Sequence, residues 1–315
     1  MIDSIIFVIS MGALIWGADF IIRESERIAL HFGISEFIIG ATLVALGTSL
    51  PEMAASVAAS AKNQSDMAIA NVLGSNIMNI ALVLGLVFLV ARRVNPHRDL
   101  FQRDSAWLLF PVIVFPLMVL DGNLSRMDGF LLVSMMGAYI LFLIDSNKED
   151  RAALGEIDTD LEKEPFKWPK SLGLLAVGFI LVVTGADYAI ESAGNLARIF
   201  GVSEWIIGLL LVAFGTSLPE LVVSISAAKK GKADMSIGNI IGSNMANTSV
   251  VLGSAAITNP LTIEFQSSLF DILLMVGVTL MLIFITANRL YSKAAGVMLL
   301  VILGIFLQHA FASVS

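Results

Sequence analysis

The feature that most constrains the fold is a series of uncharged apolar stretches that recurs from one end of the chain to the other. The ten stretches lie at 3–22, 36–61, 66–91, 105–121, 128–146, 170–190, 203–228, 234–257, 268–288 and 294–312. Each is close to the ~20 residues that a helix needs to cross about 30 Å of hydrocarbon. We therefore expect an all-α, polytopic membrane protein with ten transmembrane helices.

Composition excludes several classes of function. The 315 residues are 57% hydrophobic and 14% charged, and 19 basic against 26 acidic residues give a net charge of −7. Such a chain offers no basic surface for nucleic acid. There is no cysteine, and His31, His97 and His309 are far apart in the sequence, so thiolate chemistry and zinc or iron–sulfur sites are not expected. The lipid bilayer is the expected environment, and neither a cofactor nor an obligatory protein partner is indicated.

Positive charge predicts the orientation in the membrane. The loops after the first, third, fifth, seventh and ninth stretches hold 16 of the 19 Lys and Arg residues, and the opposite loops hold only Lys62, Arg126 and Arg198. Because cytoplasmic loops carry the excess of Lys and Arg, we expect a multi-pass protein of the cell (inner) membrane with both termini on the non-cytoplasmic side. The first basic residue is Arg23, so the first stretch lacks the charged start of a cleaved signal peptide and is expected to remain as a helix.

The chain contains an internal repeat. Residues 33–85 and 201–253 align without a gap at an offset of 168 and are identical at 29 of 53 positions. The shared text includes GTSLPE at 47–52 and 215–220 and GSN-x-x-N at 74–79 and 242–247. The tripeptide Gly-Ala-Asp that ends at Asp19 recurs at Asp187, which extends the duplication to the first and sixth stretches.

The duplication divides the chain into two units of five helices. We expect a first repeat at 1–145, a cytoplasmic linker at 146–169 and a second repeat at 170–315. An odd number of crossings makes the second copy enter the membrane from the opposite side, which is the arrangement of inverted-repeat secondary transporters. Such symmetry predicts a site near mid-bilayer that is reached alternately from each side.

Two acidic residues occupy the repeated motifs in mid-membrane. Glu52 and Glu220 each require a cation, a proton or a polar partner, because a buried charge there costs about 2.5 kcal/mol or more. A protonated carboxyl hydrogen-bonded inside the bundle is the alternative for one isolated acid. Two equivalent copies favour a shared cation site.

The residues around these acids suggest how a site could form. Pro51 and Pro219 interrupt helical hydrogen bonding, so we expect free backbone carbonyls near Ala45–Thr48 and Ala213–Thr216. The motifs add oxygens from Thr48, Ser49, Thr216, Ser217, Ser75, Ser243, Asn79 and Asn247. Hard cations prefer an all-oxygen set, and calcium takes 6–8 oxygens in a flexible shell. For Ser75 and Ser243, close packing of helices accounts for the small side chains equally well.

At these motifs the chain resembles the calcium/cation antiporter superfamily, specifically the prokaryotic sodium/calcium exchangers. The resemblance implies that Glu52 and Glu220 are the principal calcium ligands, with Thr48 and Thr216 beside them. It also implies sodium sites in the same neighbourhood and a sliding pair of helices at 3–22 and 170–190. The residues implied for sodium are Ser49, Ser217, Ser75, Ser243, Glu52 and Glu220, with Asn79 and Asn247 lining the centre.

Departures from the superfamily's patterns refine the expected ions. Several relatives, including the potassium-dependent branch, have Asp where this chain has Asn247, so potassium co-transport is not expected. The proton/calcium branch typically has Asn in place of the Thr-Ser of the GTSLPE motif, and here both copies keep Thr-Ser. We expect an antiporter that exchanges sodium for calcium, with a proton/calcium antiporter as the alternative. Asp19 and Asp187 are interpreted as structural.

Two other functional classes fit the sequence less well. An intramembrane hydrolase needs a His or Lys base near a serine nucleophile, and neither residue type lies in mid-membrane, so the chain is not expected to be an enzyme. A channel would conduct without coupling, and duplication alone does not exclude one, although broken helices in both copies favour a carrier.

Overall fold

The structure, a computed structural model, describes residues 2–91, 94–154, 166–200 and 215–312. The first half of the chain contains α1 (Ile2–Phe32), α2 (Glu36–Ile39), η1 (Gly40–Val44), α3 (Ala45–Thr48), α4 (Leu50–Ala61), α5 (Ser65–Met78), η2 (Asn79–Leu84), α6 (Gly85–Val90), α7 (Leu100–Met118), β1 (Asn123–Leu124) and α8 (Arg126–Leu154). The second half contains α9 (Trp168–Ile199), α11 (Leu218–Lys229), α12 (Ala233–Ala246), η4 (Asn247–Val251), α13 (Leu252–Thr258), β2 (Leu261–Thr262), α14 (Phe265–Ala287) and α15 (Lys293–Ala312). The segments labelled η are π-helical turns.

Long apolar helices dominate the described chain, as the sequence predicts. Eight are long and apolar enough to cross a membrane, and the bent pair of α2–α3 with α4 gives a ninth. Large apolar side chains such as Trp16 (70% exposed) and Leu141 (69% exposed) lie on the outside, where lipid would cover them. The expected seventh span, 203–228, is described only from residue 215 onward. The protein is thus an all-α polytopic membrane protein with eight to nine candidate spans.

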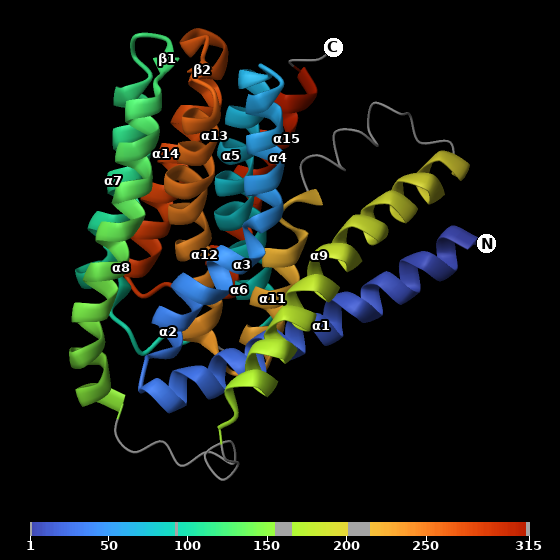
Figure 1. Ribbon diagram of the computed structural model, residues 1–315, viewed down its shortest axis with the longest axis vertical. Coiled ribbons are helices and arrows are strands. Elements are labelled where there is room, and N and C mark those ends of the chain that lie inside the picture. The colour runs from blue at the N-terminus through green and yellow to red at the C-terminus, as the bar shows by residue number, and fades with distance from the viewer. Residues whose placement is uncertain (1, 92–93, 155–165, 201–214, 313–315) are drawn as a thin grey trace.

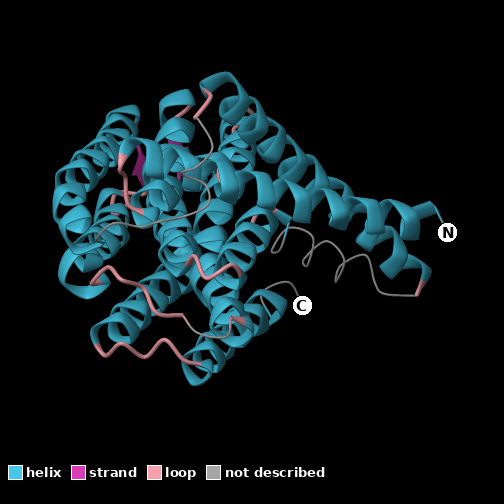
Figure 2. Ribbon diagram, turned by 90° about the horizontal axis from the view of Figure 1, so that it is seen from below, coloured by secondary structure: helices cyan, strands magenta, loops and turns pink. Residues whose placement is uncertain are grey.

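Helices α1 and α9 lie side by side and cross the rest of the bundle obliquely (Figures 1 and 2). They run antiparallel and pack closely at glycines: a Cβ at Gly17 would lie 2.8 Å from the Gly178 carbonyl oxygen, and one at Gly185 would lie 3.1 Å from the Ser10 carbonyl oxygen. Gly185 and Ser10 are the repeat counterparts of Gly17 and Gly178 at the offset of 168, so the two contacts are equivalent. The two helices are therefore related by the repeat as well as being in contact.

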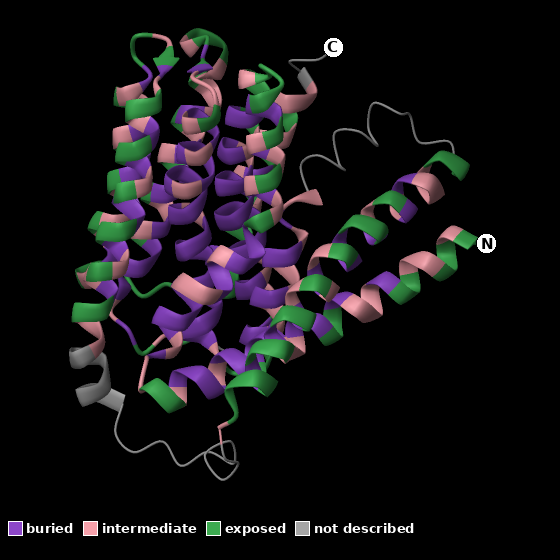
Figure 3. Cartoon of the chain, viewed as in Figure 1, coloured by how far each residue is buried: buried purple, intermediate pink, exposed green. Residues whose placement is uncertain are grey.

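The centre of the bundle is formed by two long helical segments. The segments α5–η2–α6 and α12–η4–α13 run over 65–90 and 233–258, so their ends also differ by 168. They are the most buried spans (Figure 3), whereas α1 and α9 expose their outer faces. A π-helical turn begins at Asn79 in one segment and at Asn247 in the other. Such turns are rare and often occur at functional sites.

Several boundaries differ from the sequence prediction. The first and sixth helices extend to Phe32 and Ile199, well beyond 22 and 190. The apolar stretch of α1 ends where charges begin, but Glu24 and Arg27 are buried within the protein, so polarity there does not mark the helix end. Helix α8 continues to Leu154, into the expected linker.

The described chain also contains one small strand pair, which does not alter its all-α class. The strands β1 and β2 form an antiparallel pair of two residues each. They join the α7–α8 and α13–α14 connections at one end of the bundle (Figure 1). The pair lies far from the repeated motifs and does not alter the architecture.

Candidate functional site

The GTSLPE motif bends the helix that contains it. Helix α3 ends at Thr48, α4 begins at Leu50, and their axes differ by 45°. Ser49, between them, has φ −84° and ψ 6°, and Ser217 in the second copy has nearly the same values, −85° and 1°. A proline lies in the first turn after each break, where its missing N–H costs no hydrogen bond. The two copies therefore start α4 and α11 in the same way.

The carbonyl of Ala45 is not one of the free oxygens that the sequence predicts. It accepts hydrogen bonds from the Ser49 amide at 3.0 Å and from the Thr48 hydroxyl at 3.2 Å. This carbonyl therefore keeps its helical hydrogen bond and gains a second one from the threonine side chain. The corresponding carbonyl of Ala213 lies outside the described residues.

The breaks place the two acids at helix N-termini in the middle of the bundle. Glu52 lies in the first turn of α4 and Glu220 in the first turn of α11, and neither is exposed at all. The partial positive charge at a helix N-terminus stabilises a carboxylate. It does not neutralise a full charge, so the two acids still require compensation.

Hydrogen bonds between the repeats bring the two motifs face to face. The Ser49 hydroxyl donates to Oε1 of Glu220 at 3.1 Å, and the hydroxyls of Ser75 and Thr216 lie 3.3 Å apart. Each contact joins a residue of one copy to a residue of the other, across 141 or more positions in the sequence. The acids, serines and threonines of both copies therefore belong to one central cluster.

The asparagines of the GSN-x-x-N motifs extend this cluster. Asn79 donates from Nδ2 to Oδ1 of Asn244 at 3.0 Å, and Asn244 donates to the carbonyl of Asn76 at 3.2 Å. Asn247, three residues after Asn244, is fully buried. The second asparagine of each motif also begins a π-helical turn, which changes the helical phase at that point.

Two further asparagines hold the broken helices in place, and the sequence analysis missed them. Asn71 donates to the Ser56 hydroxyl at 2.9 Å, and its counterpart Asn239 donates to the Ser224 hydroxyl at 3.0 Å. Asn239 also accepts a hydrogen bond from the Thr48 hydroxyl at 3.4 Å. The asparagine and the serine are each identical between the copies at the offset of 168, and that identity was the available signal.

Unpartnered buried atoms concentrate in the two motifs. Eight of the eleven such side-chain atoms in the described chain belong to them: both carboxylate oxygens of Glu52, Oε2 of Glu220, Oδ1 of Asn76 and of Asn79, Oγ of Ser217, and both amide atoms of Asn247. Buried polar groups in proteins almost always have partners. A cluster dominated by oxygens and holding two acids fits a cation that is bound in the course of function.

Charge compensation by protein is not seen at this cluster. No ion pair within the described ranges involves Glu52 or Glu220. Nor do those ranges hold three His, Cys, Asp or Glu side chains close enough to bind a metal together. Any cation here would be bound by two carboxylates with neutral oxygens, which is the chemistry of hard ions.

A cavity of about 890 Å³ reaches the cluster from one side of the bundle. It meets the cluster at Ser75 and Thr216 and continues between α4 and α9 to Ser267 and His309 near the C-terminus. Met67, on its wall, is 58% exposed, so the cavity opens at the end that holds the α4–α5 turn. The cluster is therefore accessible from that end.

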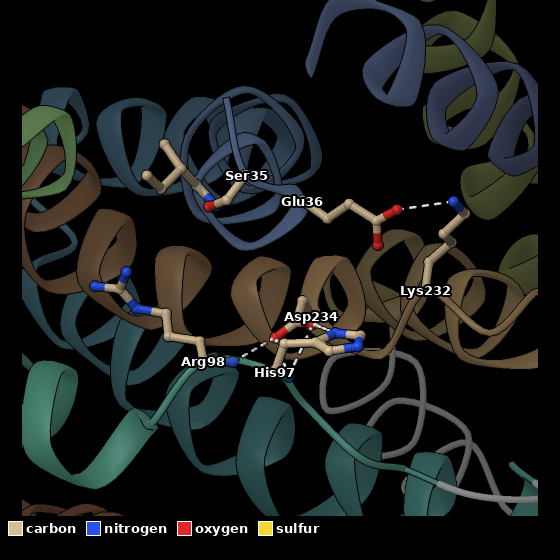
Figure 4. Close-up of polar contacts among 7 residues, drawn as sticks. Ser35, Glu36, His97, Arg98, Lys232 and Asp234 are labelled. Carbon is tan, nitrogen blue, oxygen red and sulfur yellow. Dashed lines mark hydrogen bonds and ion pairs between the residues drawn. The ribbon is translucent and has the colours of Figure 1, made fainter. Parts of the chain in front are cut away.

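Ion pairs connect the helices at the other end (Figure 4). Lys232, in the α11–α12 turn, contacts Glu26 of α1. It also lies 2.7 Å from Oε1 of Glu36 at the start of α2. Burial alone would lower the pKa of Lys232, but its hydrogen bonds to both glutamates raise it above the usual value. Asp234 accepts hydrogen bonds from the backbone amides of His97 and Arg98. These contacts join α1, α2, α12 and the α6–α7 loop.

The predicted site residues are thus brought together in large part. The structure places Thr48, Ser49, Glu52, Ser75, Asn79, Thr216, Glu220 and Ser243 in or beside the hydrogen-bonded cluster, and buries Ser217 and Asn247 with no partner among the described residues. Their roles as ion ligands stay predictions.

Comparison with known proteins identifies the family. The family model for the sodium/calcium exchanger protein matches residues 3–144 and 170–312. The chain belongs to the sodium/calcium exchanger family. Its members are membrane transporters and not enzymes, and the two matched stretches lie on either side of the 146–169 linker region.

Full-length relatives agree with this assignment. The inner membrane protein YrbG of Escherichia coli is 33% identical over 95% of this chain and 94% of its own length. The sodium/calcium exchanger MaX1 of Methanosarcina acetivorans is 31% identical over 98% of this chain and 99% of its own. A structure of the sodium-calcium exchanger NCX_Mj, soaked with Na⁺ and Sr²⁺, matches with a TM-score of 0.82 and 32% identity over 98% of each chain.

Proposed function

We propose that this protein is a secondary active antiporter that exchanges sodium for calcium across the membrane by alternating access. The observation that carries the proposal is Glu52: it is fully buried, and neither of its carboxylate oxygens has a partner among the described residues. A transported cation beside Glu52 and Glu220 would supply the missing charge. Two carboxylates balance one divalent ion or two sodium ions, so either cargo can fill the same site.

The proposed architecture is ten helices in two inverted repeats, 1–145 and 170–315, joined by a cytoplasmic linker at 146–169. The repeat-related contacts of α1 with α9 and the matched bounds of the two central segments support it. The distribution of Lys and Arg supports placing both termini on the non-cytoplasmic side. In that orientation the cavity opens outward.

Calcium and sodium would compete for overlapping oxygens in this proposal. Glu52, Glu220, Thr48 and Thr216 would bind calcium, and the serines of both motifs with the same acids would bind sodium, while Asn79 and Asn247 line the centre. Coupling then follows if the protein changes its facing state only when properly loaded. The names of MaX1 and NCX_Mj as sodium/calcium exchangers support this choice of ions.

The test is calcium uptake into proteoliposomes of the purified protein. An outward sodium gradient is compared with a proton gradient of equal size and with no gradient. We expect uptake only with sodium. Uptake driven by protons alone would replace the proposal with a proton/calcium antiporter, and uptake that needs neither gradient would indicate a channel.

A further inference from the structure

One repeated motif lies outside the central cluster. Gly-Ala-Asp occurs in α1 and again in α9, ending at Asp19 and Asp187. Asp19 forms an ion pair with Lys230 of the α11–α12 turn, with Nζ and Oδ1 2.6 Å apart. Lys230 also has a repeat counterpart, Lys62 of the α4–α5 turn, at the same offset of 168. Both members of the pair are thus duplicated.

The two turns present these lysines in the same way. Lys62 has φ −94° and ψ 10°, and Lys230 has φ −81° and ψ 3°. The next residue, Asn63 or Gly231, has a positive φ of 58° or 80°. In each turn, the backbone amide two residues after the lysine donates a 2.9 Å hydrogen bond to an alanine carbonyl. The donors are Gln64 and Lys232, and the acceptors are Ala59 and Ala227. The backbone geometry of the turn is therefore duplicated along with the lysine.

The aspartates are equally matched, because α1 and α9 make repeat-related contacts around Gly17 and Gly185. Their surroundings differ. Asp187 is exposed and lies on the wall of the cavity that separates α9 from α4. Across the described chain, neither Asp187 nor Lys62 takes part in an ion pair. One of two equivalent pairs is made here, and the other is open.

We propose that Asp19–Lys230 and Asp187–Lys62 are alternating latches, each made when its own end of the transporter is closed. This inference rests on the proposed alternating access. In the conformation described, the α11–α12 end is closed with Asp19 on Lys230, and the α4–α5 end is open. Closing the cavity would bring α9 onto the α4–α5 turn and form the second latch, while α1 leaves the α11–α12 turn and breaks the first.

A second contact makes the two ends unequal. Lys232 joins Glu26 and Glu36 at the α11–α12 end, but its counterpart at the other end is Gln64, and the counterpart of Glu26 is Gly194. The neutral pair cannot form an ion pair. The α11–α12 end therefore has an ion-pair contact whose counterpart is lost with the neutral Gln64, and this difference stabilises the conformation described here relative to the opposite one.

The proposal can be tested by cross-linking, since the chain has no cysteine of its own. One variant carries Asp19→Cys with Lys230→Cys, and a second carries Lys62→Cys with Asp187→Cys. A bifunctional thiol reagent that spans the length of an ion pair is added in detergent without an ion gradient. We expect strong cross-linking of the first pair and weak cross-linking of the second.

The second pair is then examined with Lys230→Gln and Lys232→Gln added, which removes the first latch. Cross-linking of 62 to 187 should rise, and the matched control Lys229→Gln, at a neighbouring lysine with no ion pair in the described chain, should leave it unchanged. Because ion pairs near the surface are weak, each of the two substitutions should contribute only about a two- to fivefold change in cross-linking. Cross-linking of 62 to 187 that is equal in both backgrounds would overturn the latch.

This result does not depend on which ions are carried. A protein that fails to move calcium with sodium, yet shows the expected exchange of cross-links, would refute the proposed function and retain the latch. Sodium-driven calcium uptake with no change in cross-linking would support the proposed function and refute the latch. Monodisperse elution of every variant on size-exclusion chromatography confirms that it is folded.

Discussion

The two repeats share their sequence motifs but not their surroundings. Helix α1 packs along α11, where Leu14 and Ile21 belong to the same apolar core as Val223 and Ala227. The equivalent space between α9 and α4 is the cavity. Segments related by the duplication therefore occupy unequal environments in one conformation. In a duplicated transporter, this difference in packing determines from which end the centre can be reached.

The same inequality reaches the central acids. The carboxylate of Glu220 accepts hydrogen bonds from Ser49 at 3.1 Å and from Ser243 at 3.5 Å, whereas the carboxylate of Glu52 accepts none from the described residues. The hydroxyl of Ser217, the counterpart of Ser49, donates none. The carboxylate of the first copy is therefore the less satisfied one. Exchanging these two environments is what an opposite facing state would require.

The largest effect is expected from neutralising either acid. Glu52→Gln and Glu220→Gln should each reduce sodium-driven calcium uptake to the level of protein-free liposomes, because each removes half of the charge proposed to balance calcium. Their effects on stability should differ. Glu52→Gln replaces a buried, unpartnered carboxyl group, whose charged form costs about 2.5 kcal/mol or more, by a neutral amide, so it should raise the thermal midpoint without ions. Glu220→Gln also disturbs two hydrogen bonds and should raise the midpoint less.

Thermal unfolding in detergent, with and without calcium, measures both parts of this expectation. Wild-type protein should gain stability on calcium addition, and neither variant should. Full calcium transport by either variant would contradict a site shared between the repeats.

A smaller, structural effect is expected at the glycine of the second GSN-x-x-N motif. A Cβ at Gly242 would lie 2.3 Å from the carbonyl oxygen of Ala41. Overpacking typically costs about 1–3 kcal/mol, and backbone cannot move aside as a side chain can. Gly242→Ala should therefore lower the thermal midpoint clearly. An unchanged midpoint would contradict this close packing of backbone against Gly242.

Much of the fold could be predicted from the sequence because bilayer thickness fixes helix length. The apolar stretches at 105–121 and 268–288 correspond to α7 and α14 with small shifts. The end of the first helix was predicted too early, because polar residues there are buried. Glu24 and Arg27 look like the end of a span, but other helices bury them, and α1 continues. Helix ends near charged residues depend on tertiary packing, which hydropathy does not contain.

The cluster was predictable in membership but not in detail. Two copies of GTSLPE single out Glu52 and Glu220, since one buried acid can be a protonated, hydrogen-bonded carboxyl, whereas a matched pair favours a shared cation. The π-helical turns at Asn79 and Asn247 have no sequence signal of their own. Nor does the repeat reveal which end of the protein is open, because that depends on the conformation and not on the sequence.

A sided effect is expected at the repeated serines. Ser49→Ala removes a hydrogen bond to Glu220, and a hydrogen bond to a charged group is worth about 1.5–3 kcal/mol, which corresponds to a loss of about tenfold or more in affinity. Ser217→Ala removes no bond in the conformation described. With calcium offered from the cavity side, Ser49→Ala should thus raise the half-saturating concentration more than Ser217→Ala does. Identical shifts in oriented liposomes would remove this distinction between the copies.

The smallest effect is expected from potassium, and it concerns Asn79 and Asn247, which occupy equivalent positions in the two repeats. Asn79 and Asn247 are identical, so the GTSLPE and GSN-x-x-N motifs contribute only two charges, the carboxylates of Glu52 and Glu220. One calcium ion balances them, and a potassium ion carried together with calcium would leave an uncompensated positive charge in the membrane, which is costly. Replacing external sodium or choline by potassium should therefore leave the calcium flux unchanged at a fixed sodium gradient and clamped voltage. Asn247→Asp adds a third carboxylate and breaks the symmetry. A potassium effect confined to that variant would assign the ion selectivity to this position. Strict potassium dependence of the wild type would contradict a centre balanced by two acids.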